Sequence, residues 1–241
     1  MFAFAVIAIP ITEVEMVRKF LAGFAFLLIN NAGAAGIADL TNSDATNGLK
    51  QALNEGSIAA VAKLGAENGF FGNPKVKIPL PPAMQRVESA MRLAGMRKQA
   101  DELVLTMNRA AEAAVPEAKQ LLVDAVKKMS VQDAKGILTG GDTAATEYFK
   151  RTTEGDLTKR FLPIVKKATE KVGLAQQYNS LAGQGVAFGL VKEDQATIEN
   201  YVTKKALDGL YLMIGEQEKA FRQNPLGASS DIVKKVFGTL R

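Results

Sequence analysis

The chain contains no cysteine, no histidine and no tryptophan among its 241 residues. Without cysteine the protein can form neither a disulfide nor a thiolate metal site. Without histidine it has no imidazole ligand, no histidine general base and no Ser-His-Asp triad. Any catalysis would have to rely on carboxylates, lysine, tyrosine, serine or threonine. We therefore expect no bound metal and no cofactor.

Aromatic residues make up only 7% of the chain, whereas alanine, leucine, lysine and glutamate are plentiful. These four residues lose little conformational entropy in a helix, so the composition favours an all-α fold. With 47% apolar residues, a chain of 241 residues can bury a sizeable core without covalent cross-links.

The net charge of +5 is dispersed along the chain. No basic run is interleaved with aromatic residues, as single-stranded nucleic-acid binding would require, so we expect no nucleic-acid partner. The pattern is typical of solvated helix faces and allows at most a weak contact with an anionic membrane surface. Four Lys-Lys pairs illustrate the dispersion: 127–128, 166–167, 204–205 and 234–235.

The first 34 residues read as an N-terminal extension followed by a secretory signal peptide. After Met16, a short basic segment leads into an apolar run from Phe20 to Ile29. The segment 32–34, Ala-Gly-Ala, fits the small-residue pattern of a cleavage site. The apolar run is shorter than the ~20 residues needed to span a bilayer. We expect translation from Met16, cleavage after Ala34 and a periplasmic location, with an uncleaved N-terminal anchor as the alternative.

Beyond the cleavage site, residues 35–48 are polar and turn-rich, and we expect a flexible linker there. Helical patterns begin at about Leu49 and continue with short connections. No long linker or charge block divides them, so we expect one α-helical domain over 49–241, an irregular bundle of about eight or nine helices. Pro163 is expected to kink or start a helix, 174–187 is only weakly helical, and a last helix is expected at 231–237.

Residues 73–82, the Pro-rich arm, interrupt the helical pattern with four prolines in ten residues. Proline is excluded from helix interiors and favours extended backbone in the residue before it. Val76, Ile78 and Leu80 alternate with more polar or proline positions, so one edge of this extended arm is expected to lie on the core. The pair at 81–82 suits the first turn of a following helix.

The stretch 123–153 contains signals for three consecutive helices. Ser130, three residues before Asp133, predicts a capping box. The pair Gly140-Gly141 is expected to end that short helix in the left-handed conformation, and Asp142 or Thr143 to cap the next. A glycine turn before a helix could alternatively bind an anion. However, the spacing matches no P-loop or dinucleotide motif, and Asp142 would repel a phosphate.

Five longer segments of the chain stand out: N-P-K-V-K-I-P-L-P, M-N-R-A-A-E-A-A-V-P-E-A, I-L-T-G-G-D-T-A-A-T-E-Y-F-K-R-T-T, F-L-P-I-V and Y-V-T-K-K-A-L-D-G-L-Y-L-M-I. In these segments the chain resembles a bacterial family known as domain of unknown function 4197, and the resemblance extends from about Leu49 to Phe237. The resemblance implies an exported helical protein of Gram-negative type bacteria, and it implies no established activity and no catalytic residues.

Asn108, Arg109 and Glu112 form the first candidate site. They stand among alanines, which let neighbouring helices approach closely, and their spacing places them on one helix face. They are interpreted either as a polar cluster that faces a ligand cavity or as an interhelical ion pair with no ligand.

Two further groups complete the candidate ligand-binding residues. Tyr148 and Arg151 belong to a polar group with Glu147 and Lys150, which is expected either to hold an acidic head group or to serve helix capping. On the last long helix, bulky apolar groups line either a lipid-sized pocket or simply the core: Tyr201, Tyr211 and Met213.

Three functions remain open from the sequence. The first is a periplasmic, non-catalytic protein that binds an apolar or amphipathic, lipid-like small molecule between its helices. The second is a scaffold or interaction module whose partner is another envelope protein. The third is an enzyme that depends on carboxylates and lysine. A buried apolar cavity would favour the first, and a large exposed apolar patch the second.

Overall fold

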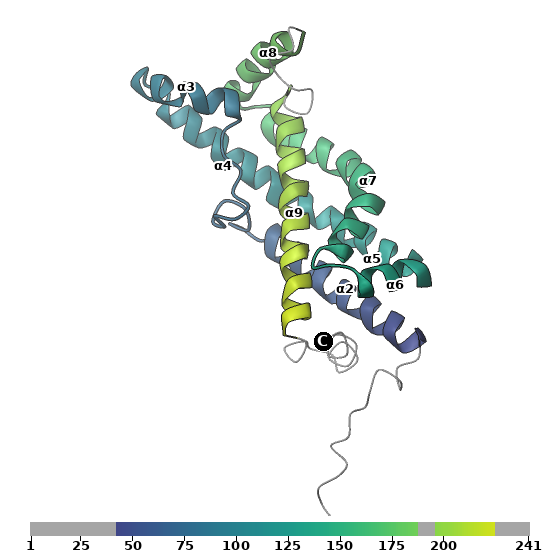
Figure 1. Cartoon of the computed structure of the whole chain (residues 1–241). Coiled ribbons are helices and arrows are strands. Elements are labelled where there is room, and N and C mark those ends of the chain that lie inside the picture. The colour runs from purple at the N-terminus through teal and green to yellow at the C-terminus, as the bar shows by residue number, and fades with distance from the viewer. Residues whose placement is uncertain (1–41, 188–195, 225–241) are drawn as a thin grey trace, which may run out of the picture. The chain divides into compact units, whose positions relative to one another are not determined.

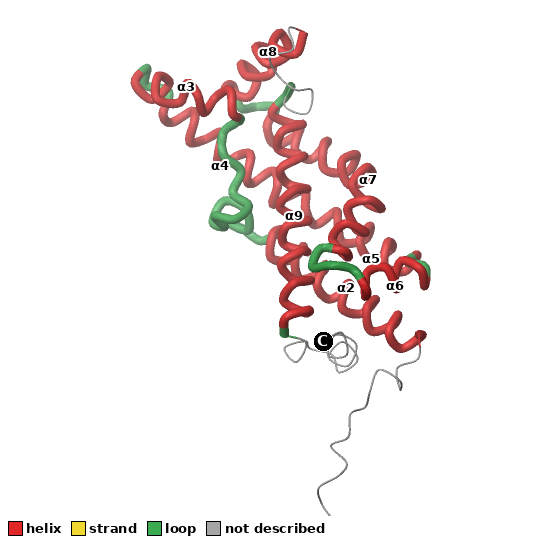
Figure 2. The backbone as a smooth tube through the Cα atoms, viewed as in Figure 1, coloured by secondary structure: helices red, strands yellow, loops and turns green. Residues whose placement is uncertain are grey.

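The computed structural model describes residues 42–187 and 196–224, which form eight α-helices and one short 3₁₀ helix (Figure 1). No strand occurs within these two ranges, and green loops join the red helices in Figure 2. The expected all-α, multi-helix fold is therefore confirmed. The elements are α2 (Asn42–Gly65), α3 (Pro82–Leu93), α4 (Arg97–Ala114), η2 (Val115–Glu117), α5 (Ala118–Lys128), α6 (Val131–Thr139), α7 (Ala144–Thr169), α8 (Gly173–Ala187) and α9 (Ile198–Gln223).

The two longest helices, α7 and α9, have 26 residues each and are about 39 Å long at 1.5 Å per residue. They pack against each other and run in opposite directions. Glu218, late in α9, bonds to the start of α7, whereas Tyr211, earlier in α9, bonds to Thr153 farther along α7. Helix α4 packs against both, and α2 packs against α9 and α5 (Figure 1).

One continuous apolar cluster lies between these helices. Its largest fully buried side chains include Phe149 and Phe161 of α7, Leu103 of α4 and Leu210 of α9. Burial of a Phe or Leu side chain stabilises a fold by about 1.5–3 kcal/mol. Phe70, from the loop after α2, also belongs to this cluster, so the loop is part of the core.

The Pro-rich arm is fixed to the core as expected, but it is not extended throughout, because residues 74–76 form a turn in which Asn73 accepts hydrogen bonds from Val76 and Lys77. Val76, Ile78 and Leu80 are all buried. The side-chain amide of Asn108, on α4, donates to the Ile78 carbonyl oxygen and accepts from the Ile78 N–H, both at 2.8 Å. A side chain therefore supplies the two hydrogen bonds that a neighbouring strand would otherwise make.

The helix-end signals were partly correct. Ser130 and Asp133 form the expected capping box at the start of α6. Gly95, between α3 and α4, has φ +81°, a conformation that glycine adopts without strain. The prediction that Gly140 is left-handed is wrong, because it is extended at φ −83° and ψ 177°. Glycine is needed there for space, since a Cβ atom would lie 2.7 Å from that of Ala144.

Three expected boundaries also change. Residues 42–48, expected as part of a linker, belong to α2. Helix α7 runs through Pro163 and does not begin there. The segment after Gly173, expected to be weakly helical, forms α8. The expected signal peptide and the helix at 231–237 lie outside the described residues.

All described residues belong to one compact unit, Leu40–Arg241. Within that described part, none of the helices combines the length and the apolar character that a bilayer crossing would need.

Candidate functional site

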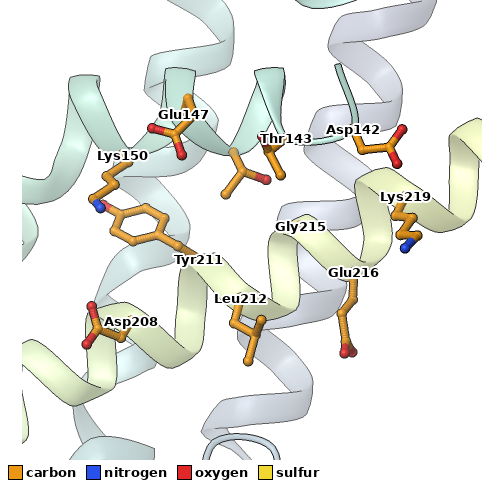
Figure 3. Close-up of a pocket in the computed structure, with 11 residues that line it drawn as sticks. Asp142, Thr143, Glu147, Lys150, Asp208, Tyr211, Leu212, Gly215, Glu216 and Lys219 are labelled. Carbon is orange, nitrogen blue, oxygen red and sulfur yellow. The ribbon is translucent and has the colours of Figure 1, made fainter. Parts of the chain in front are cut away.

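An open groove lies where the first turns of α7 face the middle of α9 (Figure 3). Its volume is about 470 Å³. We call it the α7–α9 groove. It is lined by Asp142, Thr143, Thr146, Glu147 and Lys150 on the α7 side and by Asp208, Tyr211, Leu212, Gly215, Glu216 and Lys219 on α9.

The start of α7 is fixed by a carboxylate from α9. Glu218 accepts hydrogen bonds from the N–H groups of Ala145 (2.9 Å) and Thr146 (3.0 Å) and from the Thr146 hydroxyl (2.9 Å). These N–H groups have no acceptor within their own helix, and a negative charge there also suits the helix dipole. Thr143 occupies the N-cap position, but its side chain makes no capping bond. The prediction that Asp142 or Thr143 caps α7 through its side chain is therefore wrong.

Glu218 is also paired with Arg222, which binds the end of α6. Arg222 donates to Glu218 at 2.9 Å and to the carbonyl oxygen of Ile137, near the end of α6, at 2.8 Å. A cation favours the carbonyl end of a helix. One ion pair on α9 therefore fixes both the end of α6 and the start of α7. Gly215 lets the helices approach here, since a Cβ atom would lie 3.2 Å from Oγ1 of Thr146.

Tyr211 and Leu212 form an apolar floor. Leu212 is 46% exposed, although it lies on the most central helix. Tyr211 is buried, and its hydroxyl shares a 3.0 Å hydrogen bond with Oγ1 of Thr153. Burial raises the pKa of Tyr211 to about 12; the hydrogen bond with Thr153 opposes this rise, and the charge of Glu154 adds to it. The ring therefore stays neutral at physiological pH and offers the groove an apolar surface.

Charges of both signs surround this floor. Asp208 forms an ion pair with Lys205 at 3.8 Å, and Glu216 pairs with Lys75 of the Pro-rich arm. The remaining rim charges make no side-chain hydrogen bond or ion pair within the described part of the chain: Asp142, Glu147, Lys150 and Lys219. These four groups are available to a ligand as charged donors or acceptors.

The first predicted site, Asn108, Arg109 and Glu112, is used by the protein itself. Asn108 is fully buried and is bonded to Ile78, as described above, and to the Val104 carbonyl oxygen at 2.7 Å. Arg109 donates to Glu112 at 2.6 Å. The ion pair of Arg109 and Glu112 lies within α4, so it is not the interhelical pair that was expected as one interpretation.

Glu112 holds the loop that follows α2. Its Oε1 accepts from the N–H groups of Phe70 and Phe71, both at 3.0 Å. Burial alone would raise the pKa of Glu112, but these two N–H groups and the Arg109 guanidinium outweigh it and hold that pKa below its ordinary value. Glu112 is therefore a charged anchor for the loop.

Tyr148 and Arg151 lie on a different face of α7 from the groove. The Tyr148 hydroxyl donates to the Ala125 carbonyl oxygen at 2.8 Å, and Arg151 donates to Asp133 at 3.4 Å. Both line a separate hollow of about 440 Å³ that also includes residues of α5 and α6. The polar group predicted on α7 is thus divided, because Glu147 and Lys150 line the α7–α9 groove instead.

The three residues predicted on α9 do not share a pocket. The Tyr201 hydroxyl donates to the Pro79 carbonyl oxygen at 3.2 Å, and burial raises the pKa of Tyr201 to about 12, with a smaller contribution from Tyr178. Met213 is buried and lines a hollow of about 420 Å³ beside the loop after α2. Of the predicted ligand-binding residues, only Tyr211 lines the α7–α9 groove.

Sequence reasoning missed Leu212, Gly215 and Glu218. For Leu212 a signal existed, because five consecutive apolar residues, 210–214, go more than once around a helix and cannot all face one core. For Glu218 there was none, because its partners at the start of α7 are more than 70 positions away in the sequence.

A metal site is not apparent in the described ranges, where no group of three or more Asp or Glu side chains could hold an ion. The groove itself is an amphipathic surface with an apolar floor and a charged rim.

The described residues define an all-helical protein with an open groove between α7 and α9. A family model described as "Protein of unknown function (DUF4197)" matches residues 39–238, so the chain belongs to this family. The resemblance inferred from the sequence is thereby confirmed. Neither a curated protein nor a solved structure matches the chain.

Proposed function

We propose that this protein is a non-catalytic binding protein of the bacterial envelope, and that it holds an amphipathic small molecule in the α7–α9 groove. The observation that carries this proposal is the groove's composition: a half-exposed leucine beside a neutral tyrosine ring, with four rim charges that make no ion pair within the described ranges. Its volume of about 470 Å³ lies within the range of small-molecule sites. Because the groove is open, its ligand lies along the surface and is not enclosed between helices.

The bonding behind the groove supports binding more than catalysis. Glu218 and the Tyr211 hydroxyl, its buried polar groups, are both held by bonds to the protein itself. The unpaired acids of the rim, Asp142 and Glu147, are exposed. The pKa of a general acid or base is usually shifted by desolvation. The buried groups here have no access to a ligand, and the exposed acids are not desolvated.

The envelope location rests on the sequence. The basic segment, the apolar run and the Ala-Gly-Ala site of the first 34 residues are typical of an exported protein. The test is native mass spectrometry of the protein isolated from the periplasm of its own host, followed by organic extraction. We expect a co-purified mass of amphiphile size that is lost on extraction.

A variant that fills the groove tests whether the co-purified molecule binds there. Thr143 is exposed and lines the groove without making a capping bond, so Thr143→Trp should fill the groove at little cost in stability. Val131→Trp, at an exposed position outside the groove, is the matched control. We expect Thr143→Trp to lose the ligand and Val131→Trp to retain it. A ligand-free wild type that also ignores both cationic and anionic amphiphiles would refute the proposal.

An interaction module is the second candidate function. Leu93 at the end of α3 and Leu181 in α8 are 90% and 70% exposed. Exposed leucines of this size are typical of contact surfaces when they gather in one patch. If this function is correct, Leu93→Ser and Leu181→Ser should abolish a cross-link to an envelope protein without changing groove occupancy.

A further inference from the structure

The connection between α3 and α4, residues 91–98, projects from the packed helices, and we call it the α3–α4 tip. Figure 1 shows it at the outer end of the α3–α4 pair. Gly95 turns the chain with φ +81°, and nothing lies within 4 Å of a Cβ atom added there. The N–H groups of Ala94, Gly95 and Met96 all donate to carbonyl oxygens of α3, at 2.9, 3.3 and 2.9 Å. The tip can therefore leave water without exposing an unsatisfied donor at its apex.

The apex of the tip is apolar. Leu93 is 90% exposed, more than any other large apolar side chain in the described ranges, and Ala94 beside it is also exposed. Met91 and Met96, in contrast, are half-buried and pack against the core. The two methionines thus hold the tip to the rest of the unit, while Leu93 is left for a contact outside it.

Positive charge accompanies this apolar apex. The tip contains Arg92, Arg97 and Lys98 and no acidic residue. The acids just behind it, Glu88 and Asp101, are both paired with Arg92, at 2.6 and 3.5 Å, so one cation neutralises part of their charge. The Arg97 side chain is 74% exposed and reaches Asp101 only at 3.9 Å. Lys98 makes no side-chain hydrogen bond or ion pair within the described ranges. Two cations therefore remain available beside the leucine.

We infer that the α3–α4 tip contacts an anionic phospholipid bilayer, with Leu93 inserted among the acyl chains and Arg97 and Lys98 at the head groups. A projecting apolar residue flanked by cations matches a surface that is apolar inside and anionic outside, and long basic side chains reach phosphate from such a position. The contact is weak and reversible, because a single leucine buries much less apolar area than a lipid anchor. This inference goes beyond the proposed function, since the tip includes no residue of the α7–α9 groove.

The first test exploits the absence of tryptophan from this chain. Leu93→Trp places a single tryptophan at the tip, and Val131→Trp places one at an exposed position of α6 as the matched control. Each protein, isolated from its own host, is mixed with vesicles of phosphatidylcholine alone or of phosphatidylcholine with phosphatidylglycerol. We expect the fluorescence of Leu93→Trp to shift to shorter wavelength only with the anionic vesicles, because tryptophan is stabilised at the bilayer interface. The fluorescence of Val131→Trp should stay unchanged.

The second test measures the charges by vesicle sedimentation. A basic side chain near an anionic surface contributes about fivefold in affinity, so Arg97→Gln combined with Lys98→Gln should lower binding about 25-fold. Lys119→Gln combined with Lys135→Gln is the control, because it removes the same charge from exposed positions of α5 and α6. This control should bind within about twofold of the wild type, since distant charges are screened by salt. Leu93→Ser should lower binding about tenfold through the lost apolar contact.

The outcomes separate this inference from the proposed function. Equal shifts in Leu93→Trp and Val131→Trp, or equal losses in the two charge variants, would show unspecific adsorption and overturn the role of the tip. No shift in Leu93→Trp would overturn the bilayer as partner, and a cross-link to an envelope protein that Leu93→Ser abolishes would then assign the tip to a protein contact. Thr143→Trp, which fills the groove, should leave vesicle binding unchanged. If it abolished that binding, the groove and not the tip would be the lipid contact.

Discussion

Single buried side chains hold the irregular parts of this protein in place. Glu112 binds the N–H groups of Phe70 and Phe71, and Asn108 binds both polar groups of Ile78. Each side chain comes from α4, and each fixes a segment about 30 to 40 positions earlier in the chain. A polar side chain in the core is stabilising only when all its hydrogen bonds are made. Glu112 and Asn108 make theirs to backbone groups that have no hydrogen-bond partner in a helix or a sheet.

Glu112→Gln should lower the free energy of unfolding by about 1.5–3 kcal/mol, because hydrogen bonds to a charged acceptor are stronger than those to a neutral one. Urea unfolding measures the change. Glu102→Gln, an exposed position on the same helix, is the control and should stay within about 0.5 kcal/mol of the wild type. A similar loss in both variants would contradict the anchoring role.

The stabilising contribution of Glu112 depends on pH in a defined direction. The pKa of Glu112 is lowered in the folded protein from an ordinary value of 4.5. Its stabilising contribution is therefore present above pH 4.5 and is lost as the pH falls through the lower folded value. The difference in unfolding free energy between wild type and Glu112→Gln should be constant near pH 7 and should shrink below pH 4.5. A difference that grows on acidification would show that burial dominates the pKa.

Among the helices, the ends of α6 and α7 depend on α9. Glu218→Gln removes the negative charge that is paired with the Arg222 guanidinium, itself largely buried. Removing one member of a buried ion pair costs about 3–5 kcal/mol. We expect faster amide hydrogen exchange at Ala145 and Thr146 in the first turn of α7, and little change near the start of α4. Arg160→Gln breaks an exposed pair with Glu117 and should leave exchange unchanged. Uniform acceleration across all helices would argue against a local clamp.

Two glycines in long helices should respond to alanine in opposite directions. At Gly209 of α9, an added Cβ would lie 2.8 Å from the Phe70 ring, so Gly209→Ala should destabilise by about 1–3 kcal/mol. At Gly155 of α7, nothing lies within 4 Å of the added atom. Gly155→Ala should therefore stabilise by about 0.5–1 kcal/mol through helix propensity. Thermal unfolding monitored by circular dichroism compares them, and equal effects would refute the close approach at Gly209.

The features of helices and loops that were predicted well from the sequence depend on residues that lie close together in the chain. The capping box of Ser130 and Asp133 requires residues three positions apart, and the buried edge of the Pro-rich arm follows from alternation. The bond from Glu218 to α7 requires two helices to meet first, and local patterns contain no information on that contact. The same holds for the groove, because a helical pattern does not show which of Leu210 to Ile214 faces solvent.

At the scale of the whole described unit, one apolar cluster includes residues from α2 to α9. A single cluster of this kind unfolds cooperatively, so helix content and tyrosine burial should be lost together. Circular dichroism in the far and near ultraviolet should give the same Tm within error. Two separate transitions would show that the cluster is divided into independent parts. A ligand that binds the groove should raise both Tm values equally, because it binds the folded state.

The Pro-rich arm has a consequence for the behaviour of many copies at high concentration. Extended segments with unused N–H groups can recruit a strand from another molecule and begin aggregation. Here four prolines have no N–H to offer, and the N–H groups of Lys75, Val76, Lys77 and Ile78 are all bonded within the same chain. The start of the arm is a turn closed by bonds from Val76 and Lys77 to the Asn73 carbonyl oxygen, and the arm offers almost nothing to which a foreign strand could add. A protein that folds among crowded neighbours benefits from such a closed edge.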